Sequence, residues 1–270
     1  MKNLENNLLV TVSGGRSSAF MARHIQTSKK YKDFNKIFVF ANTGMERLET
    51  IKFLKDICEF WNLPLIKIEG VYSQELGVGV KYKIVEWDDL DMSAKTFSKM
   101  IEHKTKGVFG GLPNQNAPYC SENLKTIPCK KLADKIFGLN NYKTAIGFRK
   151  EDMPKRISWA EVKEHTTKIF PLLTDFESPI SQLDLNKIYK KEEFRLELDG
   201  KFGNCELCWK KSDNNLADNI LYGTRFIEWY QKEEAKYGNT SFRGYKSIDD
   251  LVKLSLLPRT MKLDLETEDN

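Results

Sequence analysis

Six small or polar residues stand between an apolar run, Leu8 to Val12, and a segment with helical spacing; they are Ser13, Gly14, Gly15, Arg16, Ser17 and Ser18. Glycine allows the backbone to take φ > 0 and to approach an anion closely. A following helix N-terminus offers unpaired N–H groups and a partial positive charge, and the serines add hydroxyl donors. The GxxxxGK[ST] spacing of kinase and GTPase loops is absent. The pattern predicts a phosphate-binding turn, although a tight turn with a serine helix cap would leave the same sequence.

Cysteines form the second group with chemical potential. Cys205 and Cys208 make a C-x-x-C unit, and Cys120 and Cys129 precede it. Four thiolates at such spacings suit zinc or an iron–sulfur cluster, so we expect a metal site on these four residues. The alternative is a redox or incidental C-x-x-C with two buried thiols. Cys58 lies on the apolar face of a helical pattern, where core packing is its expected role.

Alternating strands and helices are expected to position these groups. The apolar runs 8–12, 36–41 and 65–68 predict strands, and the 3.6-residue periods of 17–25 and 48–61 predict the helices between them. A further strand is expected over 142–147, and further helices over 123–137, interrupted at Pro128, and over 184–197. Strands and helices that alternate at this pitch are typical of a parallel α/β sheet.

The predicted elements divide the chain into three regions. Residues 1–175 are expected to form a nucleotide-binding α/β domain, with 70–118 as an insertion or substrate-facing region. Residues 176–262 are expected to form a smaller helical C-terminal region that carries the C-x-x-C unit. The acidic tail 263–270 is expected to be disordered.

Composition narrows the class of protein. The chain has 270 residues, 40% of them hydrophobic, and a net charge of +5, which fits a nucleotide or nucleic-acid partner but does not select one. The N-terminus lacks the apolar core of a signal peptide, and the chain has no apolar run near the ~20 residues of a membrane span. We therefore expect a cytoplasmic protein without a membrane partner, in which five cysteines do not form a disulfide framework. A homo-oligomer is compatible with the sequence.

Five segments together resemble a known superfamily. The segment SGGRSS resembles the SGGxDS loop of the PP-loop ATP pyrophosphatases. Four later segments resemble their phosphoadenosine phosphosulfate (PAPS) reductase-like branch, namely residues 40–53, 118–128, 145–156 and 170–176. Ser17 replaces the Asp of the family loop, Ser121 stands in a Thr place, and Phe176 stands where Trp is usual. The resemblance implies a Rossmann-like parallel sheet flanked by helices, of the PP-loop/HUP type.

It also implies a site. The amides of residues 14–18 would hold the phosphates of ATP or a related adenine nucleotide, and Arg16 could contact a phosphate or sulfate oxygen directly. The base or ribose would be bordered by Asn42, Thr43 and Gly44, with Gly147 completing the nucleotide site. The expected catalytic cations are Lys125, Arg149 and Arg156, with Lys150 beside them. The resemblance favours [4Fe–4S] over zinc on Cys120, Cys205 and Cys208, and it is compatible with Mg²⁺. Cys129, just after Pro128, is either the fourth ligand or a residue of helix packing.

Three functions remain open from the sequence. The first is an enzyme that adenylates DNA, RNA or a nucleobase or transfers sulfur to it, which the basic charge and the C-x-x-C unit favour. The second is a PAPS or adenylylsulfate reductase; in the family that chemistry uses a nucleophilic cysteine near the C-terminus, whereas no cysteine follows Cys208 here. The third is a non-catalytic nucleotide- or nucleic-acid-binding protein, suggested by Ser17. We favour the first.

Overall fold

The computed structural model describes residues 6–105, 111–203, 205–237 and 246–258 of the chain. The predicted tail 263–270 lies outside these residues. No helix within the described ranges has the length and apolar character needed to cross a membrane.

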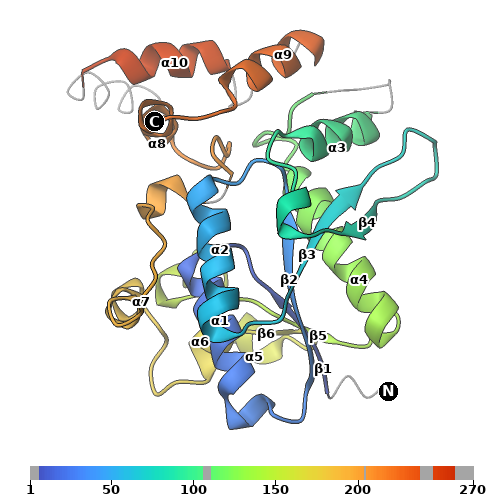
Figure 1. Cartoon of the computed structure of the whole chain (residues 1–270), viewed down its shortest axis with the longest axis vertical. Coiled ribbons are helices and arrows are strands. Elements are labelled where there is room, and N and C mark those ends of the chain that lie inside the picture. The colour runs from blue at the N-terminus through green and yellow to red at the C-terminus, as the bar shows by residue number, and fades with distance from the viewer. Residues whose placement is uncertain (1–5, 106–110, 204, 238–245, 259–270) are drawn as a thin grey trace.

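One six-stranded sheet organises the fold (Figure 1). Its strands are β1 (Asn7–Thr11), β2 (Asn35–Asn42), β3 (Leu65–Val71), β4 (Lys81–Ile84), β5 (Lys143–Ala145) and β6 (Lys168–Ile169). The order is β4-β3-β2-β1-β5-β6, and every pairing is parallel except that of β4 with β3. The α/β fold with a mostly parallel sheet, predicted from the sequence, is confirmed.

Helices cover both faces of this sheet (Figure 1). They are α1 (Arg16–Thr27), α2 (Leu48–Trp61), α3 (Lys95–Thr105), α4 (Ile127–Phe137), α5 (Trp159–Glu164), α6 (Pro171–Thr174), α7 (Gln182–Tyr189), α8 (Asp213–Tyr222), α9 (Ile227–Tyr237) and α10 (Ile248–Leu256). Leu8 and Val10 pack with α1, α2 and α7, whereas Leu9 packs with α4. Successive strand residues point to opposite faces, and burial of both faces explains why these strands read as unbroken apolar runs.

A second core lies beyond the carboxyl ends of the strands. It joins α3 with α8, α9 and α10, and it includes Met45 of the loop after β2 and Leu207 of the C-x-x-C turn. Figure 1 shows α8, α9 and α10 grouped at the top of the molecule, next to the start of α2. This second core therefore brings C-terminal segments to the edge of the sheet where ligands usually bind.

The helix predicted over 184–197 is shorter than expected, because α7 ends at Tyr189. Downstream, Phe194 packs against Phe53, Phe60 and Trp61, with ring centroids 5.1 to 5.9 Å apart. Burial of one aromatic ring against α2 thus outweighs continuation of the helix. Leu185, Tyr189, Phe194 and Leu196 consequently pack on the core that contains Leu8 and Val10. The division of the chain at residue 175 stays a prediction.

Candidate functional site

A cavity of about 760 Å³ lies at the carboxyl ends of β1, β2 and β5. Strand β1 sits between β2 and β5, so the sheet grows in opposite directions from it, and such switch points are the usual ligand sites of open α/β sheets. The sequence-predicted residues that line the cavity are Ser13, Gly15, Arg16, Ser17, Ser18, Thr43, Cys120, Lys125, Gly147, Arg149, Arg156, Cys205 and Cys208. Those not among its lining residues are Gly14, Asn42, Gly44, Cys129 and Lys150. The tertiary structure thus gathers most of the predicted site from five distant parts of the sequence.

The turn between β1 and α1 has the shape that its glycines predict. Gly14 has φ +78°, and a Cβ built there would lie 2.4 Å from Thr50 Cγ2. Gly15 caps α1 without a side-chain hydrogen bond to its first amides. The Ser18 hydroxyl accepts a hydrogen bond from the Ser13 amide at 3.0 Å and donates to the Gly15 carbonyl at 3.0 Å, which fixes the turn from inside. Gly14 therefore shapes the turn, while the N-terminal amides of α1 remain available to a ligand.

The loop after β5 packs directly on this turn. A Cβ at Gly147 would lie 3.3 Å from Ser18 Cα and 3.4 Å from the carbonyl carbon of Ser17. A side chain at residue 147 would have to push against the main chain of α1. Gly147 thus allows the loop that carries Arg149 to lie beside the predicted phosphate site.

Two arginines of that loop are held by one carboxylate. Asp152 Oδ2 accepts a hydrogen bond from the Arg149 amide at 2.9 Å, and Oδ1 accepts one from Arg156 Nη1 at 2.9 Å. Arg149 Nη1 also donates to Gln182 Oε1, and the Arg156 guanidinium lies 4.5 Å from the Phe148 ring centroid. These contacts fix the direction of both cations along the cavity wall. Because both Asp152 oxygens already accept from arginines, Asp152 is a poor candidate for holding Mg²⁺.

Arg16 is oriented by α7 rather than left free on the first turn. Its Nη1 donates to Asn186 Oδ1 at 2.9 Å, and its carbonyl accepts from the Tyr189 hydroxyl at 2.9 Å. The side chain still lines the cavity. A phosphate bound on the adjacent amides would therefore meet a planar charged donor already in place.

Lys125 enters the cavity from a π-helical turn, Glu122–Thr126, that precedes α4. Pro128 has no N–H to bond the carbonyl four residues earlier, which favours such a wide turn at the interruption predicted from the sequence. Lys125 Nζ lies 3.6 Å from Glu46 Oε1. Burial acts to lower the pKa of Lys125, but the Glu46 carboxylate and the neighbouring cysteines together outweigh it and the pKa is raised. The amine is therefore a stable positive charge on the cavity wall.

Three of the four predicted cysteine ligands share this wall, and the fourth does not. Cys120, Cys205 and Cys208 line the cavity, and Cys205 Sγ lies 3.4 Å from Thr43 Oγ1. Burial raises the pKa of Cys205 to about 12, so its thiol is protonated at neutral pH. Cys129 is buried with Leu132 and Ala133 in the core beneath the opposite face of the sheet.

The four-cysteine ligand set for [4Fe–4S] or zinc is therefore not assembled. Among the residues that the structure describes, no three or more His, Cys, Asp or Glu side chains form a group that could hold a metal ion. Cys129 on α4 follows the helical period of Leu132 and Ala133 and is buried with them in an apolar core, which is the helix-packing role that the sequence had left open. We derive no step through a metal cluster.

Comparison with known proteins gives the family. The chain is 30% identical over 260 residues to the "Uncharacterized nin region protein ORF290" of Escherichia phage lambda, a match that covers 91% of this chain and 84% of that protein. The chain belongs to the family of this phage protein. No family model matches the sequence. A crystal structure of PAPS reductase from Candida auris, in a phosphate complex, is similar over 68% of this chain and 72% of that chain, with 18% identity and a TM-score of 0.40.

Two residues expected at the nucleotide, Asn42 and Gly44, shape the loop after β2. Asn42 is fully buried; its Nδ2 donates to Glu69 Oε1 at 2.7 Å and to the Asp91 carbonyl at 2.8 Å. Gly44 has φ +85°, and a Cβ there would lie 2.5 Å from Asp91 Oδ2. Thr43, between them, reaches the cavity. Asn42 and Gly44 thus hold the loop through contacts within the protein, and their place beside the nucleotide stays a prediction.

The cavity also contains two cations for which the sequence left two roles open, holding a phosphate or forming an exposed basic end of the C-x-x-C turn. Lys210 and Lys211 line it, and Lys211 Nζ donates to the Glu206 carbonyl at 3.1 Å and to Asn219 Oδ1 at 3.0 Å. Burial lowers the pKa of Lys211 to about 8. Their position next to the C-x-x-C unit was the available signal, but an exposed basic turn would have had the same sequence.

Proposed function

We propose that the chain binds ATP or a related adenine nucleotide in this cavity, with the phosphates on the main-chain amides of residues 14–18. The observation that carries the proposal is the uncapped N-terminus of α1, which borders the cavity behind a turn that requires glycine at residue 14. Such amides and the helix dipole together favour an anion.

The charge of the cavity supports the same ligand. Its lining contains six cationic side chains, Arg16, Lys125, Arg149, Arg156, Lys210 and Lys211, against two carboxylates, Asp152 and Asp199. Asp152 is already paired with both arginines. The excess of positive charge suits a polyphosphate, and cations fixed in advance stabilise charge that develops on a leaving phosphate.

The reaction that we propose is transfer of an adenylyl group, or of sulfur, to a nucleobase or to DNA or RNA. Lys125, Arg149 and Arg156 would neutralise the pyrophosphate released from ATP. The thiols of Cys120, Cys205 and Cys208 lie on the wall of the same cavity, so a sulfur atom and an activated acceptor would share one site. These thiols also favour a second candidate, reduction of a sulfonucleotide such as PAPS.

Equilibrium dialysis with ATP, AMP and PAPS tests the nucleotide site. We expect ATP to bind the wild-type protein and to bind Arg149→Ala about tenfold more weakly, equivalent to about 1.4 kcal/mol. Arg23→Ala is the matched control, because Arg23 donates to the Trp61 carbonyl at 3.0 Å and is not among the cavity residues. Equal affinity in both variants, or no binding by the wild type, would contradict the proposal.

Product analysis then separates the reactions. Release of AMP and pyrophosphate from ATP in the presence of an acceptor would support adenylation. Release of sulfite from PAPS would support the reductase instead. Tight binding without turnover of either nucleotide would leave a non-catalytic binding protein.

A further inference from the structure

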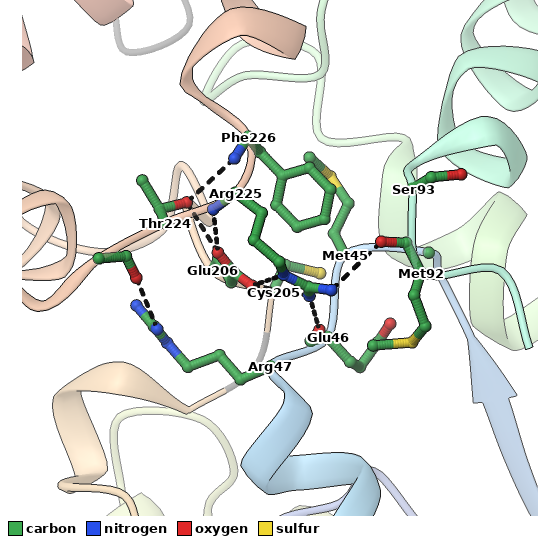
Figure 2. A network of polar contacts seen from close by, with 12 residues as sticks. Met45, Glu46, Arg47, Met92, Ser93, Cys205, Glu206, Thr224, Arg225 and Phe226 are labelled. Carbon is green, nitrogen blue, oxygen red and sulfur yellow. Dashed lines mark hydrogen bonds and ion pairs between the residues drawn. The ribbon is translucent and has the colours of Figure 1, made fainter.

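One of the two residues between the cysteines of the C-x-x-C turn, Glu206, is a buried carboxylate. Glu206 is 2% exposed. Its Oε2 accepts hydrogen bonds from Thr224 Oγ1 at 2.8 Å and from the Arg225 amide at 3.0 Å, and its Oε1 accepts from Arg225 Nε at 2.9 Å (Figure 2). The link between α8 and α9 therefore binds the C-x-x-C turn through the Glu206 side chain.

The Arg225 guanidinium also donates hydrogen bonds to two further segments. Its Nη2 donates to the Glu46 carbonyl at 2.6 Å, in the loop after β2, and its Nη1 donates to the Met92 carbonyl at 3.2 Å, just before α3 (Figure 2). The Glu206 amide in turn donates to the Met45 carbonyl at 3.0 Å. A planar group with several fixed donors can join three segments in this way, whereas an ammonium cannot.

We propose that Arg225 and Glu206 are positioning residues of the cavity: they hold Cys205 and Cys208 against the loop whose Glu46 carboxylate faces Lys125. This inference rests on the proposed function, because it assigns the pair a role in the same site. Neither Arg225 nor Glu206 is among the cavity residues, so the pair acts through the groups that it holds.

The cost of the pair argues for such a role. Removing a carboxylate from water is expensive, and apolar side chains of similar size often fill the same space at no loss of stability. Here the guanidinium contacts go to the carboxylate inside the C-x-x-C turn and to the carbonyls of two loops, one of which also carries Thr43 into the cavity. The pair thus sets the relative position of two cavity walls.

Alkylation of the thiols measures that position directly. Mass spectrometry measures the rate at which iodoacetamide labels Cys205, Cys208 and Cys58, with and without ATP. These rates are compared between the wild-type protein and four variants, Arg225→Ala, Arg225→Lys, Glu206→Gln and Arg23→Ala. We expect Arg225→Ala to label at Cys205 and Cys208 about tenfold faster, as local opening of the turn requires. Protection by ATP should be lost, and Cys58, which is not among the cavity residues, should keep its wild-type rate.

The conservative variants keep the test decisive. Arg225→Lys retains the positive charge but not the planar set of guanidinium donors, so it should show an intermediate labelling rate. Glu206→Gln retains the shape of the side chain without its charge. These two variants are the test if Arg225→Ala does not fold. The positioning role would be overturned if Arg225→Ala labels at Cys205 and Cys208 at the same rates as the control Arg23→Ala, when the two variants have lost a similar amount of melting temperature. If wild type binds no ATP, the proposed function fails, but the labelling rates without ATP still decide whether the pair holds the turn.

Discussion

Replacing Gly14 by alanine tests the turn that leads from β1 into α1. An L-residue at φ +78° costs about 1–2 kcal/mol. The new Cβ would also lie 2.4 Å from Thr50 Cγ2, and Thr50 is a buried β-branched residue of α2 that cannot rotate away easily. Overpacking of this kind costs about 1–3 kcal/mol. We therefore expect the free energy of unfolding to fall by about 2–5 kcal/mol in total.

Gly77→Ala is the matched control for this variant. Gly77 has φ +81°, but nothing lies within 4 Å of a Cβ built there. It should lose only the conformational part, about 1–2 kcal/mol. Urea unfolding of wild type and both variants measures the difference, and equilibrium dialysis with ATP measures whether the displaced amides of residues 14–18 still bind phosphate. We expect about tenfold weaker ATP binding for Gly14→Ala and no change for Gly77→Ala.

Two results would refute this reasoning. Equal losses of stability in the two variants would mean that the contact with Thr50 relaxes at no cost. Unchanged ATP affinity in a folded Gly14→Ala protein would mean that the turn does not hold the phosphates.

Three further predictions concern other parts of the chain. Burial alone would raise the pKa of Asp175, but hydrogen bonds from His24, Lys30 and Tyr31 outweigh it and hold the pKa well below its usual range. The contribution of this carboxylate to the free energy of unfolding is therefore complete above the ordinary pKa of about 4, and it is lost as the pH falls toward the lowered pKa. Asp175→Asn should lose about 1.5–3 kcal/mol at pH 7 and show a flatter acid unfolding profile. Asn42→Ala should lose about 1–3 kcal/mol of stability, because buried Glu69 loses a donor. Arg149→Ala should weaken ATP binding more than Arg156→Ala, because the side chains are 27% and 62% exposed and the more exposed charge is screened more.

Each of these has its own check. Urea unfolding at pH 7 and between about pH 2 and 5 follows Asp175→Asn, and a profile parallel to that of wild type would contradict the assigned titration. For Asn42→Ala, a folded protein of normal stability that no longer binds ATP would indicate that Asn42 contacts the nucleotide. Dialysis at low and high salt compares the arginine variants, and a larger loss for Arg156→Ala would place the phosphates nearer the cavity rim.

Local patterns were sufficient for the parts of the fold that depend on neighbours in sequence. The mostly apolar run 8–12 predicted a buried strand, and β1 is that strand. The helical period of 48–61 matches α2 because its apolar stripe faces the sheet. The helix expected over 184–197 was overestimated, since the ring of Phe194 finds its partners only across the fold.

By itself the sequence determined the strand–turn–helix with its glycine turn before α1, because glycine conformations and helix N-termini are properties of a few consecutive residues. Tertiary structure alone decided which distant groups meet there. It turned Cys129 into a core residue, used the amide of Asn42 to satisfy Glu69, and brought Arg225 across to the C-x-x-C turn. Such assignments depend on which face of a helix is buried and on which charges must be paired once water is excluded, and no local pattern encodes either.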